Sequence, residues 1–406
     1  MTHGDLIVRS AQLSDESVVN IGIKDGRILE ISSPSTSGYT YAEEIDARGF
    51  CVLPSFVEPH AHLDKAFLAD RVHNPAGDLM GAIEGLANVR HTLTRADTIE
   101  RATRAVALMS RNGVTSVRTH ADTTLSGGLD SVLALLEVKQ QCAHFIDVQV
   151  AALMEWPLTG TEGASRRSLT RDAIDAGVDV IGGCPHLDPD PKGAVEFLLN
   201  TAVSADVPLD LHADENLRTT SVDLEHLAHV VLSEGVQHRI AASHCVSLST
   251  RDERDIQRIA EMVALAGISV IALPQTNLYL QARGVHSNSP RAITPIHALR
   301  RAGVNVAAGA DNLQDPFNLV GRADPLEIAS LLMTASHLST AEAMESVTTN
   351  SSLIVTGEKH LLTVGSPANL VGVRSTTVRE AIAMGPPDRF VVYGGVAISE
   401  QKRNRK

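Results

Sequence analysis

The sequence predicts an α/β fold: a (β/α)8 TIM barrel accompanied by a small β-sandwich-like domain that both termini build. The barrel is predicted by a junction that occurs four times, in which a glycine suited to a helix end precedes a β-branched residue opening a short apolar run. The junctions are Asn112-Gly113-Val114, Ala176-Gly177-Val178, Ala266-Gly267-Ile268 and Ala302-Gly303-Val304. Helices alternating with strands imply parallel strands and right-handed crossovers, which a closed barrel accommodates economically.

The two ends of the chain predict the second domain, because both resemble short strands joined by turns. Val19 to Glu30 alternates apolar and polar residues around Asp25-Gly26, a strong hairpin signal. Near the C-terminus, Ala368 to Val373 and Arg389 to Ile398 have a similar pattern. We therefore expect residues 1–54 and 362–406 to form one composite β domain, with a continuous barrel at residues 55–361.

Capping residues mark helix starts inside the barrel segment. Thr94 followed by Asp97 resembles a capping box. Thr294-Pro295 predicts a second start, with the threonine as N-cap and the proline at the first helical position.

Composition favours a barrel core of aliphatic side chains and excludes some partners. Hydrophobic residues make up 43% of the 406 residues but aromatic residues only 3%, so we expect Val, Ile, Leu and Ala to fill the core. The net charge of -13 repels phosphate backbones and anionic lipids, so neither nucleic acid nor membrane is an expected partner.

The expected location is cytoplasmic. The chain has no basic and apolar signal sequence, and no apolar run approaches the roughly 20 residues that span a bilayer. The four cysteines form no close pair, which suits buried thiols in a reducing compartment. They are Cys51, Cys142, Cys184 and Cys245.

Several expected strands end in a side chain that can bind a metal ion or move a proton. His60 and His62 are separated by one residue, so on a strand both imidazoles point to the same face. The other strand ends are His120, Glu155, His212, His244 and Asp311. In a barrel these residues gather at the C-terminal ends of the strands, where active sites lie.

Three imidazoles and one carboxylate make a suitable ligand set for one divalent metal ion, Zn or Fe, and leave a position for water. The expected ligands are His60, His62, His212 and Asp311. Glu215 follows His212 by three residues and can shuttle a proton to the substrate, while His244 can hold or deprotonate the attacking water.

Several stretches together resemble the cytosine deaminase branch of the amidohydrolase superfamily, in order and over nearly the whole chain. They are Phe56–Lys65 (FVEPHAHLDK), Val117–Asp122 (VRTHAD), His212–Glu215 (HADE), Ser243-His244, Asn277–Arg283 (NLYLQAR) and Gly309–Asn312 (GADN). The resemblance implies a mononuclear metal site with the same four ligands, Glu215 as acid/base, and His244 and Asp311 managing the proton of the water. Residues 178–184 contain no lysine, whereas binuclear relatives carry a carboxylated lysine there. This difference argues against a hydantoinase-like enzyme.

The chain departs from that family pattern at the positions that would hold the substrate. Glu155 stands where cytosine deaminases usually have a glutamine, and it would favour a ring that presents N–H groups or positive charge. Asn312 replaces the usual aspartate, and Phe317 stands where a tryptophan is common. Lys65 and Asn312 look more like the branch that removes alkylamines from aminotriazines. His120 is a further candidate to contact substrate, or alternatively to hold a loop.

We therefore expect a metal-dependent deaminase that hydrolyses an exocyclic amine from a small nitrogen heterocycle, cytosine-like or creatinine-like, and releases ammonia. Two alternatives within enzymes are removal of an alkylamine from an aminotriazine and opening of a cyclic amide. The alternative outside catalysis is a binding barrel. The expected partners are a small heterocyclic substrate and further copies of the chain in a homo-oligomer.

Overall fold

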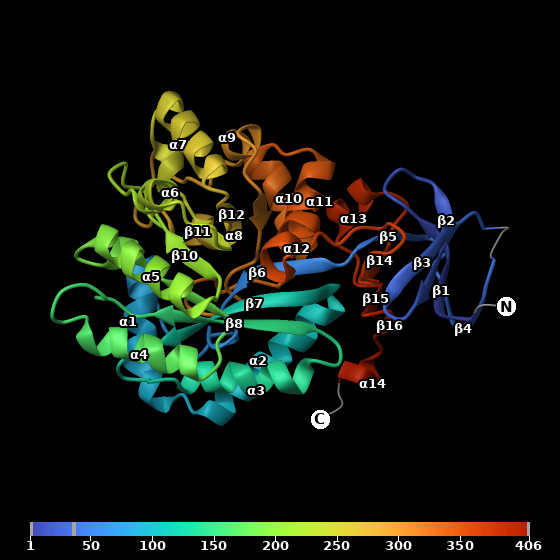
Figure 1. The fold of residues 1–406 in the computed structure, drawn as a ribbon, viewed down its shortest axis with the longest axis horizontal. Coiled ribbons are helices and arrows are strands. Elements are labelled where there is room, and N and C mark those ends of the chain that lie inside the picture. The colour runs from blue at the N-terminus through green and yellow to red at the C-terminus, as the bar shows by residue number, and fades with distance from the viewer. Residues whose placement is uncertain (1–2, 35–37, 404–406) are drawn as a thin grey trace.

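The barrel that the sequence predicts is present in the computed structural model, which describes residues 3–34 and 38–403. Its eight strands all pair in parallel, in chain order (Figure 1). They are β6 (Phe56–Ala61), β7 (Val114–Thr123), β8 (Asp147–Met154), β9 (Val180–Gly183), β10 (Leu209–Ala213), β11 (Ile240–His244), β12 (Ser269–Ala272) and β13 (Val306–Ala308). The expected α/β barrel fold is confirmed.

The first and last barrel strands meet just beyond the end of β13. The backbone N–H of Asp311 donates to the carbonyl of His60 at 3.1 Å, and Ala61 pairs with Asp311 in a parallel bridge. The Glu58 carboxylate accepts the N–H groups of His60 and Ala310 at 3.1 and 3.0 Å. At Gly309 a Cβ atom would lie 2.2 Å from that carboxylate, so glycine allows this close approach. The closure therefore brings His60 beside Asp311.

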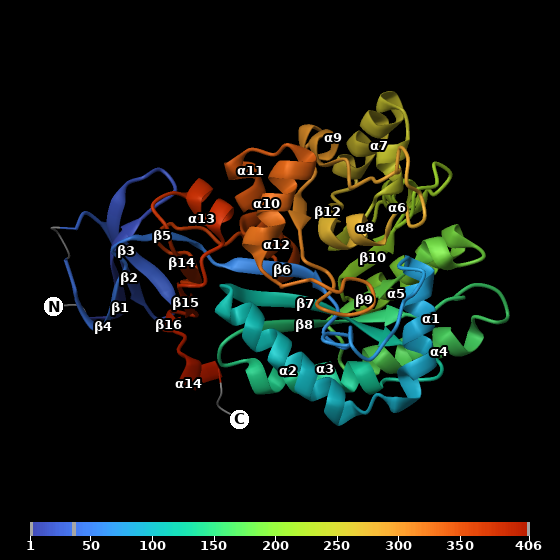
Figure 2. The same cartoon turned by 180° about the vertical axis from the view of Figure 1, so that it is seen from behind.

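Helices surround the barrel (Figure 2). They are α1 (Leu79–Val89), α2 (Arg95–Arg111), α3 (Asp130–Cys142), α4 (Ala164–Asp175), α5 (Pro191–Ala205), α6 (Asp223–Glu234), α7 (Glu253–Leu265), α8 (Pro274–Leu280), α9 (Ile296–Arg301), α10 (Pro325–Ser336), α11 (Thr340–Val347) and α12 (Thr349–Thr356). Of these, α1 to α9 connect the barrel strands, and α10 to α12 follow the last one. The four junction glycines have positive φ, from 66° to 96°, as a left-handed helix end requires. None of the described helices is both long and apolar enough to cross a bilayer.

One of the two expected helix starts is confirmed and the other is wrong. Thr94 is the N-cap of α2, and its hydroxyl accepts from the Asp97 N–H at 3.2 Å. In α9, by contrast, the N-cap is Pro295 and no side chain caps the helix. The Thr294 hydroxyl instead donates to the carbonyl of His244 at 2.5 Å. The hydroxyl that the local pattern predicts as a helix cap is therefore used in a tertiary hydrogen bond next to the site.

Strands from both ends of the chain form a second, separate sheet at one end of the molecule (Figures 1 and 2). They are β1 (His3–Gln12), β2 (Val18–Lys24), β3 (Arg27–Ser32), β4 (Thr40–Asp46), β5 (Phe50–Pro54), β14 (Leu370–Arg374), β15 (Arg389–Tyr393) and β16 (Val396–Ala397), with short helices α13 (Val378–Met384) and α14 (Glu400–Arg403). β5 pairs with β14, which joins the two ends. The expected hairpin at Asp25-Gly26 is present, and a second hairpin turns at Gly394-Gly395 between β15 and β16. Residues 1–2, 35–37 and 404–406 of the expected composite domain lie outside the described residues.

Aliphatic side chains fill the layer between the strands and the helices, as composition predicts. The inside of the barrel contains buried charged side chains instead. Arg118 on β7 donates to Asp210 on β10 at 2.8 Å, and both residues are fully buried. Because β7 and β10 are not neighbours in the sheet, this ion pair crosses the barrel interior. The expectation of an aliphatic core therefore holds for the outer layer and is wrong for much of the lumen.

Candidate metal centre and active site

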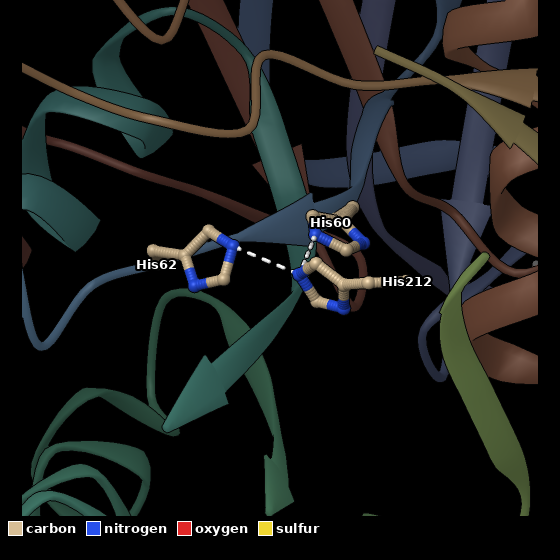
Figure 3. A group of neighbouring side chains, drawn as sticks. All are labelled: His60, His62 and His212. Atoms are coloured by element: carbon tan, nitrogen blue, oxygen red, sulfur yellow. Dashed lines mark hydrogen bonds between the residues drawn. The ribbon is translucent and has the colours of Figure 1, made fainter. Parts of the chain in front are cut away.

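Three imidazole nitrogens converge at the C-terminal ends of the barrel strands (Figure 3). Nε2 of His212 lies 3.1 Å from Nε2 of His60 and 3.2 Å from Nε2 of His62. All three side chains are buried. Two nitrogens bound tetrahedrally to one zinc ion at about 2.0–2.1 Å are ~3.3 Å apart, so the observed spacing fits a shared ion.

Asp311 supplies a carboxylate at the same point. Its Oδ1 lies 3.2 Å from Nε2 of His62 and 3.7 Å from Nε2 of His60. Both carboxylate oxygens are buried, and neither accepts a hydrogen bond from the described residues. A buried carboxylate without donors is costly unless a cation neutralises it. These groups therefore fit one divalent cation, held by His60, His62, His212 and Asp311.

The electrostatics hold these groups in their metal-binding forms. Burial, and then the neighbouring imidazoles, lower the pKa of both His60 and His212 well below the ordinary value, so both rings are neutral. Burial opposes ionisation of Asp311, but the adjacent imidazole of His62 outweighs burial and lowers the pKa of Asp311. Neutral imidazole and ionised carboxylate are the forms that ligate metals.

Glu215 and His244 lie together beside this centre. Oε1 of Glu215 is 3.6 Å from Nδ1 of His244. Burial, and then the charge of Asp311, raise the pKa of Glu215 well above its usual value, which favours the protonated form of the carboxyl. Burial lowers the pKa of His244 to about 4, despite the opposing charge of Asp311, so the ring is free to accept a proton. The pair thus combines a proton donor and a proton acceptor.

Four residues at the site have positive φ, a left-handed backbone conformation that residues other than glycine rarely adopt. Asp214, His244, Cys245 and Asp311 have φ of 55°, 68°, 51° and 62°. Such residues persist only where surrounding contacts hold them, and they concentrate at functional sites. For His244 the contacts are the Thr294 hydroxyl on its carbonyl and the Asn277 amide, whose Nδ2 lies 3.0 Å from Nδ1 of the ring.

A cavity of about 150 Å³ opens from these groups. The polar side chains that line it include His62, His212, Glu215, His244 and Asp311. Its apolar lining comes from Leu79, Ile83, Leu86 and Ala87 of α1 together with Leu153, Met154, Trp156, Leu187 and Phe317. The cavity therefore offers polar groups to a planar ring and apolar surface to a further ring or substituent.

Four of the five substrate-binding candidates line this cavity: Lys65, Glu155, Asn312 and Phe317. Lys65 is buried and its Nζ lies 2.6 Å from Asp122 and 3.1 Å from Nδ1 of His62. Asn312 accepts from the Thr276 hydroxyl at 3.3 Å and donates to Asp315 at 2.8 Å. Both side chains are thus committed to neighbours as well as facing the cavity.

Glu155 faces the cavity but also forms an ion pair. Its Oε2 accepts from Nε of Arg166 and from the backbone N–H of Leu125, each at 3.0 Å. One carboxylate oxygen is therefore held by the protein, and the geometry is compatible with both a recognition role and a structural role.

His120 does not line the cavity, and we correct the expectation that it contacts substrate. Its ring stacks on His60 with centroids 4.0 Å apart, and it is completely buried. Nε2 of His120 lies 3.7 Å from Asp210, deeper in the barrel than the metal ligands. The residue supports a metal ligand instead of reaching the cavity.

Sequence reasoning missed two groups of residues at the site. The first is α1, which covers the cavity; the apolar spacing of Leu79, Ile83 and Leu86 was the available signal. The second is Arg90, which follows α1 and lines the cavity. Its guanidinium donates to the Asp122 carboxylate at 2.8 Å. Arg90 lies in an expected connection, where no strand or helix pattern points to it.

A closed barrel with three imidazoles, a carboxylate and a proton-transfer pair at its strand ends defines the class of metal-dependent barrel hydrolases. A family model described as "Amidohydrolase family" matches residues 88–397. The chain belongs to the amidohydrolase family, which confirms the resemblance predicted from its motifs.

Similar proteins cover almost the whole chain. The pterin deaminase of Rhizobium rhizogenes is 31% identical over 385 residues, which make up 93% of this chain and 87% of the relative. The structure of 5-methylcytosine deaminase from Klebsiella pneumoniae with 5-fluorocytosine is 29% identical, with a TM-score of 0.88 and 97% of each chain covered. The N-isopropylammelide isopropylaminohydrolase of Burkholderia multivorans has 25% identity, a TM-score of 0.83 and 98% coverage of each chain. The chain is accordingly a metal-dependent hydrolase that acts on C–N bonds.

Proposed function

We propose that this protein is a deaminase that replaces an exocyclic amine on an amidine carbon of a nitrogen heterocycle with oxygen and releases ammonia. The observation that carries this proposal is the placement of Glu215, whose pKa is raised, 3.6 Å from His244, whose pKa is lowered, at a candidate metal centre. Relatives named as deaminases of pterin and of 5-methylcytosine support the reaction class.

The metal ion, Zn or Fe, would supply hydroxide at neutral pH by lowering the pKa of a coordinated water to about 7. His60, His62, His212 and Asp311 would hold it. The chain's own groups then handle the protons. Glu215 donates its proton to the ring nitrogen of the amidine, which makes the adjacent carbon electrophilic. His244 and Asp311 accept the proton of the attacking water. His244 then passes this proton to the exocyclic nitrogen, and the C–N bond breaks as ammonia leaves. The new C–OH group becomes the carbonyl and returns its proton to Glu215, which restores both side chains.

The lining of the cavity favours a substrate that carries an apolar part beside its polar ring. Apolar side chains of α1, together with Trp156 and Phe317, line the same cavity as the candidate metal ligands, so they could contact a second fused ring or a substituent. Burying such a group against aliphatic and aromatic side chains is favourable. A bicyclic 2-amino-4-oxo ring and a substituted cytosine are the two shapes that suit this arrangement.

A second candidate reaction is removal of an alkylamine from an aminotriazine. The apolar lining of the cavity would accept an alkyl group. Lys65 and Asn312 resemble the residues of the branch that removes alkylamines from aminotriazines. The similarity to N-isopropylammelide isopropylaminohydrolase supports this candidate. Both reactions use the same proton donor and differ in the amine that leaves.

One experiment separates these reactions. Purified protein would be analysed for transition metals and assayed with cytosine, 5-methylcytosine, isocytosine, creatinine, pterin and N-isopropylammelide, with separate detection of ammonia and isopropylamine. We expect about one metal ion per chain and ammonia from an amino-substituted ring. Isopropylamine without ammonia would establish the second candidate. A protein that holds no transition metal and does not respond to added zinc or iron would refute both.

The expected homo-oligomer stays a prediction. Light scattering of the purified protein during size-exclusion chromatography would measure the mass against that of one 43.2 kDa chain.

A further inference from the structure

The metal ligand His60 ends a chain of hydrogen bonds that crosses the barrel interior. Nδ1 of His60 lies 2.8 Å from Oγ of Ser243 on β11. The Ser243 hydroxyl donates to Oδ1 of Asp210 on β10 at 2.8 Å. Oδ2 of Asp210 accepts from Nη1 of Arg118 on β7, also at 2.8 Å. All four side chains are almost completely buried, so solvent does not replace any of these partners.

Arg118 is itself fixed at the far end of this chain. Its Nη2 donates to the carbonyl of Ile354 in α12 at 2.9 Å, and Nε donates to Oε1 of Gln149 at 3.3 Å. The guanidinium is always charged and only donates, so Asp210 opposite it is kept as a carboxylate that only accepts.

The direction of each hydrogen bond follows from the donors and acceptors available. Asp210 is an acceptor, so the single proton of the Ser243 hydroxyl points to it. Ser243 then has only lone pairs to offer His60, so Nδ1 of His60 carries the ring proton and donates. A neutral imidazole has one N–H, and Nε2 of His60 therefore keeps its lone pair and faces His212 and the metal position.

We propose that Arg118, Asp210 and Ser243 are positioning residues that fix the tautomer of His60, and that they thereby prepare Nε2 to bind the metal. The inference rests on the metal centre of the proposed function. A hydrogen-bond partner on the second nitrogen of a ligating histidine is a recurrent way to orient the ring, and its loss typically costs about 10- to 100-fold in metal affinity.

The sharpest test is Asp210→Asn, which changes one atom without changing shape. Arg118 still requires an acceptor, so the amide oxygen of the asparagine faces Arg118 and its NH2 faces Ser243. Ser243 would accept that hydrogen bond and donate its own proton to Nδ1 of His60. The ring would then adopt the Nε2–H tautomer and lose the lone pair that binds metal. We expect the affinity of the chelator-treated protein for Zn²⁺ alone to fall by about 10- to 100-fold.

Ser243→Ala and a matched control distinguish this role from simple packing. Ser243→Ala leaves Nδ1 without an acceptor but does not impose the wrong tautomer, so its loss of zinc affinity should be no larger than that of Asp210→Asn. A packing role predicts the reverse order, because only Ser243→Ala removes an atom. The control is Asp179→Asn, since Asp179 also pairs with a cation, Lys139, but lies outside the barrel lumen. It should bind zinc like the wild type.

A spectroscopic readout decides the question even if Asp210→Asn does not fold. Long-range ¹H–¹⁵N correlations of ¹⁵N-histidine-labelled, metal-free wild-type protein report each tautomer, with His60 assigned through His60→Gln. We expect His60 as the Nδ1–H form. The Nε2–H form in the wild type, or unchanged zinc affinity in folded Asp210→Asn, would overturn the proposed relay. Failure of the wild type to bind any transition metal is a different result, which would overturn the metal centre.

Discussion

The core of the terminal β domain and the lumen of the barrel are both buried, but they contain opposite kinds of side chain. The core of the β domain is apolar and includes Leu6, Val8, Ile21, Ile23, Val52, Leu370 and Val392. The lumen instead contains Glu58, His60, Arg118, His120, Asp210, His212, Ser243 and Asp311, all of them buried. Apolar burial stabilises a fold directly, whereas buried charges are costly unless each has a partner.

The buried residues of the β domain therefore serve stability, whereas those of the lumen serve both stability and function. In the lumen, partners of buried charges also hydrogen-bond to a candidate metal ligand, so we expect the contacts that compensate burial to prepare the site as well. Arg118 and Asp210 illustrate this, because their ion pair continues through Ser243 to His60. Substitutions in the lumen should therefore change activity and stability together, and substitutions in the β domain should change stability alone.

The largest expected effect on catalysis without loss of the metal comes from Glu215→Gln. The amide cannot deliver a proton, so kcat should fall by about 10²- to 10⁴-fold while metal content is unchanged. Because the pKa of Glu215 is raised, the wild type should lose activity as pH rises through that pKa and the acid form disappears. The variant should lack this alkaline decline. Elemental analysis and kcat measured across pH check both points. An alkaline limb that persists in Glu215→Gln would assign the proton donor elsewhere.

Arg118→Met should have a large effect on both stability and activity. It leaves the buried Asp210 carboxylate without its cation, and breaking a buried pair in this way costs about 3–5 kcal/mol. The ring of His60 loses the end of its hydrogen-bond chain in the same step. Chemical denaturation gives the change in free energy of unfolding, and zinc titration gives the change in affinity. Normal affinity in a destabilised variant would mean that the pair serves stability alone.

Local patterns predicted the parts of the fold that depend on neighbours in sequence. The junction glycines end helices because few other residues adopt positive φ, and Asp25-Gly26 turns because its backbone suits a tight hairpin. The period-two rule placed His60 and His62 on one face, and the geometry brings both to the expected ligand set. These inferences need no knowledge of distant residues.

What the sequence did not reveal depends on contacts between distant segments. Ser243 is 183 residues from His60, and no local pattern pairs them. The same is true of Thr294, whose hydroxyl holds the His244 backbone instead of capping a helix. One signal was available: Arg118 and Asp210 lie two positions before His120 and His212, so strand periodicity puts them on the same lumen-facing side. Charged residues at such positions indicate a polar lumen.

Leu370→Ala tests the other half of the comparison. Leu370 is fully buried on β14 in the core of the β domain. Its truncation should reduce the free energy of unfolding by about 2–5 kcal/mol. Because this core contains none of the site residues, kcat and metal content of the folded fraction should match the wild type. Thermal unfolding and activity assays at a temperature where the variant is folded provide the measurements. A loss of zinc affinity would show that the two regions are coupled.

The smallest expected effect is a change of substrate preference in Glu155→Gln. Arg166 and the Leu125 N–H both donate to one carboxylate oxygen, so in the variant the amide oxygen would keep these partners and the NH2 group would face the cavity. A donor there suits a ring carbonyl, so relative kcat/KM should shift toward cytosine-like rings by about tenfold, the effect of one hydrogen bond. Arg166→Met is the matched control, because it breaks the ion pair but keeps the carboxylate. If Glu155 only anchors Arg166, neither variant should change the ratio of substrates. A shift confined to Glu155→Gln would mean that this carboxylate contacts the substrate ring.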